Sequence, residues 1–291
     1  LHSTTFGVGE LIRAALDTGA ERLILTLGGS ATNDAGAGML EALGARLLDN
    51  EGHPLPPGGA ALASLARLDL SGLDPRLASL AVDTAVDVDN PLLGERGASA
   101  VFGPQKGATP EDVARLDTAL AHFAEHAADA LGEDHRTLAG AGAAGGMGFA
   151  AAAFLGARLK PGIELVMEQV GFGRLLTEAS LVITGEGQLD GQSLSGKTPV
   201  GIARLARRHG VPTVALAGRL GDGWRAVHDE GIEAALALAD GPLSLPDALA
   251  RTASLLAGRR LGTRSPSGRK SAAVKGRQVA SPPAAGETPR V

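Results

Sequence analysis

The chain has 291 residues, 44% of them hydrophobic and 20% charged, which is an ordinary composition for a globular protein with a substantial buried core. It contains no cysteine, so neither disulfides nor thiolate chemistry is available to it. No apolar run approaches the roughly 20 residues of a membrane-spanning helix, and no signal peptide opens the sequence. We therefore expect a cytoplasmic protein without a membrane partner.

The net charge of −5 is distributed unevenly along the chain. Residues 259–291 carry eight Lys or Arg against one acid, so residues 1–258 hold 19 basic and 31 acidic groups, a net charge of −12. An acidic body argues against nucleic acid as a ligand. Residues 259–291 are rich in Ser, Pro, Gly and Arg, which predicts a basic disordered tail. Residues 1–258 are expected to form the folded core, in two lobes.

Helical apolar stripes and short apolar runs alternate along residues 1–258. In chain order the pattern predicts a helix at 9–16, a strand at 22–27, a helix at 35–48, a strand at 80–88, a long helix from Thr109, a strand at 181–184, a helix at 199–209, and strands at 213–217 and 234–238. Thr109, Pro110 and Asp112 have the arrangement of an N-cap, a first-turn proline and a capping box. Strands that alternate with helices indicate an α/β fold with parallel sheets covered on both faces. Ligands of such sheets bind beyond the carboxyl ends of the strands.

The first loop at such a position is residues 28–34, between a predicted strand and a predicted helix. Its two glycines allow backbone N–H groups to approach an anion, and the start of a helix adds a favourable field. A tight turn with helix-capping residues is the alternative interpretation. The candidate ligand-binding residues of this loop are Gly28, Gly29, Ser30, Thr32, Asn33 and Asp34.

The second loop, residues 140–148, contains five glycines and leads into an alanine-rich helix. It matches the pattern G-x-G-x-x-G of dinucleotide-binding proteins, but no predicted strand precedes it, so we reject an NAD site. A loop that cradles a phosphate remains the interpretation, with Gly142, Gly145 and Gly146 as candidate residues.

The third loop follows the strand predicted at 181–184 and contains Glu186, Asp190 and Lys197. Residues 191–198 match the P-loop pattern G-x-x-x-x-G-K-S/T. The context argues against a P-loop, because six residues separate the strand from the first glycine and because Pro199 lies where the helix should already be running. Lys197 at a helix start can still bind phosphate as a point charge.

Residues 122–126 have the H-x-x-E-H form of one metalloprotease class. The segment lies inside the predicted long helix, whose apolar stripe includes Phe123, and the sequence indicates no third ligand. We interpret it as a solvated helix face rather than a zinc site.

These motifs together resemble the bacterial glycerate kinase family of the glycerate 2-kinase type. The matching stretches are residues 28–39, 87–92, 102–108, 140–148, 184–192 and 196–201. They occur in one order and spacing across residues 3–257, which is far more specific than any single motif. The resemblance implies two three-layer α/β domains with a cleft between them. It also implies a kinase that phosphorylates D-glycerate to phosphoglycerate, with the 2-phosphate favoured, using ATP and Mg²⁺, and it makes the P-loop match accidental.

Phosphoryl transfer needs cations on the phosphates, carboxylates for Mg²⁺ and a group that orients the attacking hydroxyl. The resemblance places Lys106 and Glu186 among the substrate- or phosphate-binding residues. Asp87, Asp190 and Lys197 are the catalytic candidates, and Asp89 and Asp190 are the candidate Mg²⁺ ligands. Which aspartate is the base and which binds the metal stays open, since each follows a predicted strand end. We expect D-glycerate and ATP as partners, no nucleic acid, and a homodimer.

Family members have a longer N-terminal segment with an Asp-Ser-Phe-Lys motif that this sequence lacks, so the resemblance is to an N-terminally incomplete member. We expect the site loops to converge on one cleft. We also expect the chain as given to bind nucleotide loosely and to phosphorylate glycerate weakly or not at all. The alternatives are a catalytically inactive nucleotide-binding fragment of this fold and a P-loop ATPase in which Lys197 contacts the phosphates.

Overall fold

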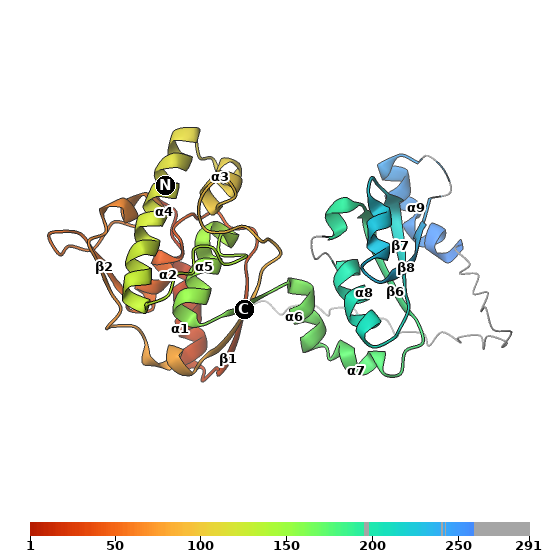
Figure 1. Ribbon diagram of the computed structural model, residues 1–291, viewed down its shortest axis with the longest axis horizontal. Helices are drawn as coiled ribbons and strands as arrows, with labels where there is room; N and C mark the ends of the chain where they lie inside the picture. Colours follow the sequence, from red (N-terminus) through yellow and green to blue (C-terminus); the bar gives the residue numbers. More distant parts are fainter. Residues whose placement is uncertain (195–197, 240, 242, 259–291) are drawn as a thin grey trace, which may run out of the picture. The chain divides into compact units, whose positions relative to one another are not determined.

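The computed structural model describes residues 1–194, 198–239, 241 and 243–258 (Figure 1). The described chain divides into two units, one at Leu1–Ala237 and one that begins at Leu238. The first unit holds two parallel sheets with separate hydrophobic cores, and the second includes helix α9 (Leu245–Gly258). The predicted α/β class is confirmed, whereas two three-layer domains with a cleft between them stay a prediction. The basic tail predicted for residues 259–291 lies outside the described residues.

The first sheet has the strand order β1-β4-β5, and neighbouring strands run parallel. Its strands are β1 (Arg22–Thr26), β4 (Ala81–Ala85) and β5 (Arg158–Lys160). Leu23, Leu25 and Val82 pack into the core on one face, as the two-residue period of a strand requires. Because the strands are parallel, their carboxyl ends lie at one edge of the sheet, and the loops that follow β1 and β4 leave from there.

Five helices lie between residues 1 and 160: α1 (Phe6–Asp17), α2 (Ala37–Ala42), α3 (Ala98–Phe102), α4 (Pro110–Leu131) and α5 (Ala143–Leu155). At the start of α4 the Thr109 hydroxyl accepts a hydrogen bond from Asp112 N–H, and the Asp112 carboxylate accepts one from Thr109 N–H. This confirms the predicted capping box. None of the helices in the described part of the chain is long and apolar enough to cross a membrane.

The helix predicted for residues 35–48 is wrong in its second half. Helix α2 ends at Ala42, and β2 (Arg46–Leu48) pairs antiparallel with β3 (Arg67–Asp69). The cause lies at Gly44, whose backbone packs so closely on Gly72 that any side chain there would overlap it. The apolar residues that follow are buried from a strand instead of a helix.

A charged cluster crosses the first sheet at Asp83, on the central strand. Its carboxylate lies 2.7 Å from Arg22 on β1, 2.9 Å from Arg158 on β5 and 3.7 Å from Lys160. Burial alone would raise the pKa of Asp83, but the hydrogen bond from Arg22 and the charges of Lys160 and Arg158 outweigh it and hold that pKa below its ordinary value. One buried carboxylate therefore links all three strands.

The second sheet has the order β6-β7-β8, again with parallel neighbours. Its strands are β6 (Val182–Leu189), β7 (Thr213–Leu220) and β8 (Ile232–Ala237), and the helices of this part are α6 (Gly162–Gln169), α7 (Phe172–Leu176) and α8 (Thr198–Arg208). Helix α8 buries Val200, Ala203 and Ala206. All three strands match predicted strands, but β6 runs five residues beyond its predicted end.

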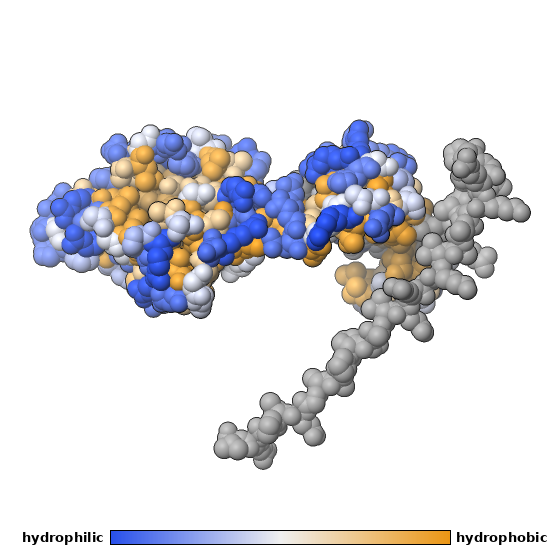
Figure 2. All heavy atoms as spheres, turned by 90° about the horizontal axis from the view of Figure 1, so that it is seen from below, coloured by the Kyte–Doolittle hydropathy of each residue, from blue (hydrophilic) through white to orange (hydrophobic). Residues whose placement is uncertain are grey.

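Apolar side chains also reach the surface, and Figure 2 shows them as orange areas among hydrophilic residues. Leu175 on α7 and Ile183 on β6 are more than half exposed. Both also line an apolar cavity of about 270 Å³. The outer edge of β6 is unpaired within the described residues, so this apolar surface adjoins a free strand edge.

Candidate active site

The loop at residues 28–34 leaves the carboxyl end of β1 and leads toward α2, as predicted. Nothing lies within 4 Å of the position that a Cβ would take at Gly28 or Gly29, so the backbone is open on that side. Gly29 has a φ of +63°, which favours glycine. Both glycines are exposed, whereas Ser30 is half-buried. An open pair of glycines after a parallel strand suits the approach of a small anion.

Asp34, at the end of this loop, points its carboxylate into the protein and is only 1% exposed. Its Oδ2 accepts hydrogen bonds from the N–H of Thr5 at 2.7 Å and from the hydroxyl of Thr5 at 2.9 Å. The N–H groups of Gly36 and Gly38 also donate to this carboxylate. The carboxylate of Asp34 therefore has a structural role, because its hydrogen bonds hold the segment before α1 to the start of α2. A role in substrate binding stays a prediction.

Lys106 comes from another segment, the single turn Pro104–Lys106 after α3. Its ammonium group donates a hydrogen bond of 2.7 Å to the carbonyl oxygen of Thr32. Burial lowers the pKa of Lys106, and the negative charge of Asp34 opposes this effect. An ammonium group has three donors, so this bond leaves capacity for a ligand. The half-buried cation thus lies directly beside the loop at residues 28–34.

Asn33 is a second link between the same two segments, because its Nδ2 donates a hydrogen bond of 2.9 Å to the hydroxyl oxygen of Ser99. Ser99 is fully buried in the first turn of α3. The other amide atom, Oδ1 of Asn33, is buried and has no hydrogen-bond partner among the described residues. Ser99 is not among the residues predicted from the sequence, because a lone serine in a helix's first turn has no distinctive signal.

The loop at residues 140–148 packs directly on the loop at residues 28–34. Gly145 has a φ of +71°, and its carbonyl oxygen accepts a hydrogen bond of 2.9 Å from Ala35 N–H. A Cβ at Gly145 would overlap the carbonyl oxygen of Thr32. The candidate glycines of this loop are all buried: Gly142, Gly145 and Gly146. Close packing accounts for them, because Gly145 and Gly146 pack on residues 32–35 and Gly142 packs on Pro91. A phosphate contact stays a prediction.

Asp87 and Asp89 follow the carboxyl end of β4, and both are exposed. Oδ1 of Asp87 accepts a hydrogen bond of 2.8 Å from the N–H of Gly162, the first residue of α6, where a carboxylate is favoured by the helix dipole. Asp89 instead forms an ion pair of 2.9 Å with Arg96. The two aspartates therefore have different partners, and their catalytic and metal-binding roles stay predictions.

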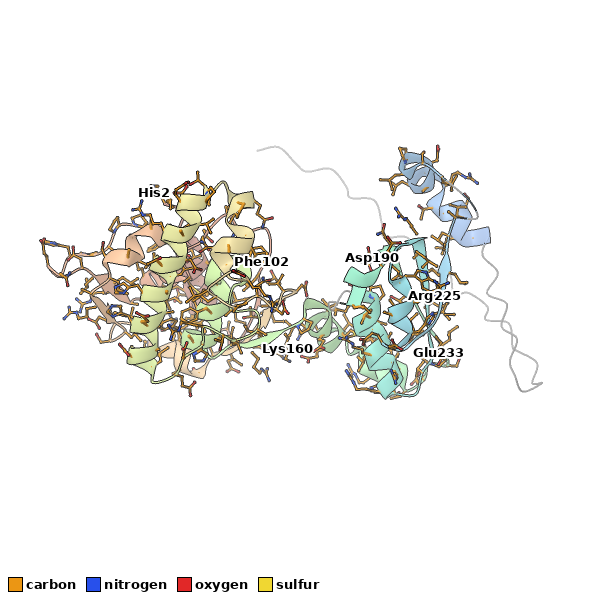
Figure 3. The ribbon with its side chains drawn as sticks, turned by 45° about the horizontal axis from the view of Figure 1, so that its top comes forward. His2, Phe102, Lys160, Asp190, Arg225 and Glu233 are labelled. Atoms are coloured by element: carbon orange, nitrogen blue, oxygen red, sulfur yellow. The ribbon has the colours of Figure 1, made fainter. Side chains whose placement is uncertain are left out.

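Glu186 lies inside β6, and Asp190 directly follows this strand. Gln188 donates a hydrogen bond of 2.6 Å to the carboxylate of Asp190. Oε2 of Glu186 is buried and has no hydrogen-bond partner within the described ranges. Figure 3 shows Asp190 at one end of the second sheet and Glu233 of β8 toward the other end. Lys197 lies outside the described residues.

Apart from Asp87, Asp89 and the undescribed Lys197, the predicted residues form two groups. The first group surrounds Lys106 and includes the loops at residues 28–34 and 140–148, which contact each other. The second group, at the carboxyl end of β6, includes Glu186 and Asp190. Convergence of both groups on one cleft stays a prediction.

The spacing argument against a P-loop at residues 191–198 is wrong. Strand β6 continues to Leu189, so one residue, not six, separates it from Gly191. Residues Gly191–Leu194 form a 3-10 turn, and α8 begins at Thr198 with Pro199 in its first turn. This spacing therefore no longer argues against a P-loop.

His122 and His126 lie on α4, as predicted. Nε2 of His122 is 2.7 Å from the carbonyl oxygen of Leu65, and the two histidine rings meet edge to face with centroids 4.7 Å apart. The half-buried His122 thus has a protein partner. The face is therefore partly buried and packed on Leu65, and not fully solvated as predicted.

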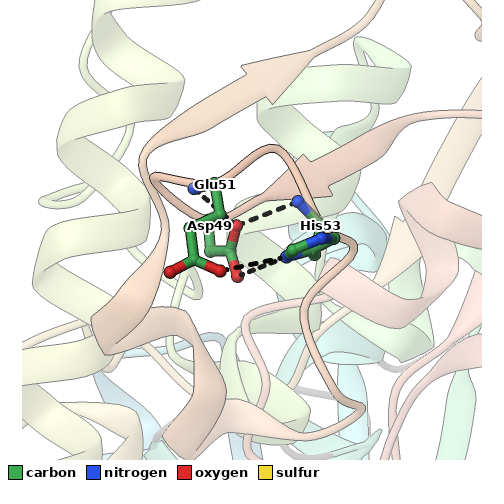
Figure 4. A group of neighbouring side chains, drawn as sticks. All are labelled: Asp49, Glu51 and His53. Atoms are coloured by element: carbon green, nitrogen blue, oxygen red, sulfur yellow. Dashed lines mark hydrogen bonds and ion pairs between the residues drawn. The ribbon is translucent and has the colours of Figure 1, made fainter.

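Three other potential metal ligands, Asp49, Glu51 and His53, meet in the exposed turn after β2 (Figure 4). Nδ1 of His53 lies 3.4 Å from Glu51 and 3.8 Å from Asp49. Asp49 also accepts hydrogen bonds from the N–H groups of both neighbours, which lowers its pKa and closes the turn. The hydrogen bonds that form this turn explain why the three side chains lie close together.

Parallel strands whose carboxyl-end loops combine open glycines with a half-buried lysine are typical of α/β enzymes that bind small anionic ligands. Comparison with known proteins identifies the group more closely. The model of the glycerate kinase family matches residues 1–261, and the chain therefore belongs to the glycerate kinase family.

Three similar proteins illustrate this relationship. Glycerate kinase of Bacillus subtilis (strain 168) is 51% identical over 256 residues, which are 88% of this chain and 67% of that protein. Glycerate 2-kinase of Escherichia coli (strain K12) is 49% identical over 234 residues, 80% of this chain and 61% of its own length. A crystal structure assigned to a glycerate kinase 2 from Salmonella typhimurium LT2 matches with a TM-score of 0.75 and 49% identity, over 88% of this chain and 67% of that one. The chain thus spans about two thirds of its relatives' length.

Proposed function

We propose that this chain forms the greater part of a kinase that transfers a phosphoryl group from ATP to D-glycerate, with 2-phosphoglycerate as the product. The observation that carries the proposal is the identity of about half the residues with curated glycerate kinases over most of the chain. The chain is an enzyme of this family. The acceptor, the donor and the metal ion are the parts of the proposal that experiments must test.

The group around Lys106 is proposed to bind the hydroxy acid. The open backbone at Gly28 and Gly29 and the half-buried ammonium of Lys106 provide donors for a carboxylate or a phosphate. Because Thr32 already fixes the lysine, little side-chain entropy is lost when an anion binds. These residues would bind and orient the acceptor.

The group at the end of β6 is proposed to serve the phosphoryl transfer itself. Carboxylates are the ligands that Mg²⁺ prefers, and Asp190 and Oε2 of Glu186, which has no hydrogen-bond partner among the described residues, supply carboxylate oxygens there. When bound, Mg²⁺ would neutralise charge on the phosphates of ATP. Asp89 fits less well as a metal ligand, because Arg96 already pairs with it. Lys197 is proposed to hold a phosphate as a point charge.

In the proposed step the acceptor hydroxyl oxygen forms a bond to the γ-phosphorus of ATP, and the bond from that phosphorus to the oxygen of the leaving ADP breaks. The hydroxyl proton passes to a carboxylate base, for which Asp190 and Asp87 are the candidates. Positioning of the two reactants, rather than covalent catalysis, supplies most of the rate in such reactions.

A coupled assay of ADP release with D-glycerate, ATP and Mg²⁺ tests this function. Joined to the part of the Bacillus subtilis relative that it does not match, the chain should turn over at the rate of metabolic kinases, about 1–100 per second, and phosphorus NMR should show 2-phosphoglycerate. The assay compares this chain with the same chain joined to the part of the Bacillus subtilis relative that it does not match. ADP release that is independent of D-glycerate in both proteins would contradict the proposal and favour an ATPase.

The alternative, an inactive nucleotide-binding fragment, is not favoured by the comparisons, since the named relatives are glycerate kinases. A cytoplasmic location and a homodimer stay predictions.

A further inference from the structure

One face of the second sheet changes from buried to exposed toward the carboxyl ends of its strands. On β7, Ala215 and Ala217 lie on this face and are fully buried, and the next residue on the same face, Arg219, is exposed. Both alanines belong to the hydrophobic cluster that includes Val200 from the first turn of α8. Arg219 therefore extends from the sheet beyond the part of this face that is packed in the core.

The register of the strands places Arg219 beside the group at the end of β6. In the parallel pair of β6 and β7, Gln188 is the partner of Arg219 and Glu186 is the partner of Ala217. Partners in a parallel pair point to the same face of the sheet, so Glu186, Gln188 and Arg219 share one face. The side chain of Gln188 donates a hydrogen bond of 2.6 Å to the carboxylate of Asp190. Arg219 is thus the neighbour of the residue that contacts Asp190.

The two segments stay together beyond Arg219. The N–H of Gly221 donates a hydrogen bond of 2.7 Å to the carbonyl oxygen of Leu189, and the N–H of Gly191 donates one of 2.9 Å to the carbonyl oxygen of Asp222. The chain segments that follow β6 and β7 therefore form one continuous edge, and Arg219 and Asp190 lie on adjacent parts of it.

Arg219 forms no ion pair with any residue that the structure describes. Other arginines of this part of the chain do have partners. Arg204 on α8 lies 2.6 Å from Glu230, and Arg225 lies over the ring of Trp224, 5.0 Å from its centroid. The five N–H donors of the Arg219 guanidinium are therefore not engaged by an acidic side chain of the described chain.

The group at the end of β6 needs a cation if it serves phosphoryl transfer. Glu186 and Asp190 are both carboxylates, whereas the phosphates of ATP carry negative charges that cationic side chains and Mg²⁺ neutralise. The planar guanidinium of an arginine matches two oxygens of one phosphate and forms short, charge-assisted hydrogen bonds with them. Arg219 supplies such a cation on the face that these residues share.

We propose that Arg219 is an ATP-binding residue whose guanidinium holds a phosphate of the nucleotide at the carboxyl ends of β6 and β7, beside Asp190. This inference rests on the proposed function and adds a side chain that recognises the phosphoryl donor. Arg219 lies outside every sequence motif that carries the family resemblance, so the register of β6 and β7 is what reveals it.

Calorimetric titration with ATP and Mg²⁺, without D-glycerate, tests this contact on the chain joined to the unmatched part of the Bacillus subtilis relative. We expect Arg219→Gln to weaken ATP binding at least roughly tenfold, the factor for one lost charge-assisted hydrogen bond, and to leave the affinity for D-glycerate within about twofold. A normal affinity for ATP in this variant would overturn the inference. An equal loss for both ligands would also overturn it, because it would indicate a general disturbance of the structure.

Two further variants separate charge from geometry and from position. Arg219→Lys keeps the positive charge but loses the planar fork, so its affinity for ATP should lie between those of Arg219→Gln and the unaltered protein. Arg208→Gln is the matched control, because it changes an exposed arginine at the last residue of α8, and its affinity for ATP should be normal. Identical affinities of Arg219→Lys and Arg219→Gln would contradict a contact between this side chain and a phosphate.

The proposed function and this inference fail in different ways. ADP release that depends on D-glycerate, combined with an unchanged affinity for ATP in Arg219→Gln, would keep the function and overturn the inference. Binding of ATP that depends on Arg219, without any phosphorylation of D-glycerate, would overturn the function and support the inference.

Discussion

The ammonium group of Lys106 lies 2.7 Å from the carbonyl oxygen of Thr32, although 74 residues separate the two in the sequence. This hydrogen bond connects the turn after α3 to the loop after β1. It therefore places a cation beside Thr32 in the loop at residues 28–34 before any ligand arrives. Preorganised donors of this kind are the main means by which enzymes stabilise developing charge.

Replacement of this cation should separate activity from folding. We expect Lys106→Met to lower kcat/KM for D-glycerate by roughly a hundredfold, because one preorganised donor is lost, while the protein stays folded. Arg67→Gln, an exposed cation on β3, is the control and should retain normal kinetics. Steady-state kinetics measures the activity of both variants, and circular dichroism measures their folding. A normal kcat/KM for Lys106→Met would show that this lysine is not part of the active site.

Asp190 offers a second test at the end of β6. We expect Asp190→Asn to reduce turnover by roughly a hundredfold or more, because an amide can neither accept the hydroxyl proton nor bind Mg²⁺ as a carboxylate does. The matched control is Asp222→Asn, an exposed aspartate in the turn after β7. The prediction fails if both variants have the same kcat in the ADP-release assay.

Gly145 and Gly29 form a matched pair for stability. Both have positive φ, 71° and 63°, but a Cβ at Gly145 overlaps the carbonyl oxygen of Thr32, whereas a Cβ at Gly29 meets open space. We expect Gly29→Ala to lower the free energy of unfolding by about 1–2 kcal/mol, from backbone strain alone, and Gly145→Ala by about 3–5 kcal/mol. Urea denaturation measures both. Equal losses of the free energy of unfolding would mean that the two loops move apart around the added Cβ at no energetic cost.

The cluster at Asp83 predicts a pH dependence of stability. Its pKa is lower in the folded chain than in the unfolded chain, so the carboxylate contributes stability above the unfolded value of about 3.9, and this contribution is lost as the pH falls through the folded-state pKa. We expect Asp83→Asn to destabilise the protein most near neutral pH, and the difference from the unaltered chain to shrink below about pH 4.

Denaturation of both proteins between about pH 3 and pH 7 measures this difference. Asp89→Asn, which changes an exposed ion pair, should show a small difference at every pH. A difference between Asp83→Asn and the unaltered chain that stays constant over the range would contradict the assigned cause.

Local sequence patterns predicted much of the fold because their physical causes are local. The capping box at Thr109 depends on residues three apart, and each predicted strand depends on its own apolar run. The pairing of β2 with β3 depends instead on the contact between Gly44 and Gly72, which no nearby residue reveals. The sequence pattern therefore predicts that the helix continues to residue 48, whereas the chain forms strand β2 there.

The candidate site was predictable in its loops but not in the direction of its side chains. Residue type suggested ligand binding for Asp34, yet this carboxylate faces Thr5 in the interior. Ser99 could not be predicted from its neighbours in the sequence, because its hydrogen-bond partner is the amide of Asn33, 66 residues away. Sequence spacing places residues at strand ends, whereas tertiary packing decides which of them remain open to a ligand.

The close contact between Gly145 and Thr32 also has a consequence at the level of the gene. Every amino-acid replacement that arises from a glycine codon by a single base change introduces a Cβ, and at this position that atom overlaps a backbone oxygen. Selection would therefore remove such replacements even in a descendant that had lost its catalytic activity. Conservation of glycine at position 145 among related sequences would therefore result from the packing of these two loops, and it would not require a bound ligand.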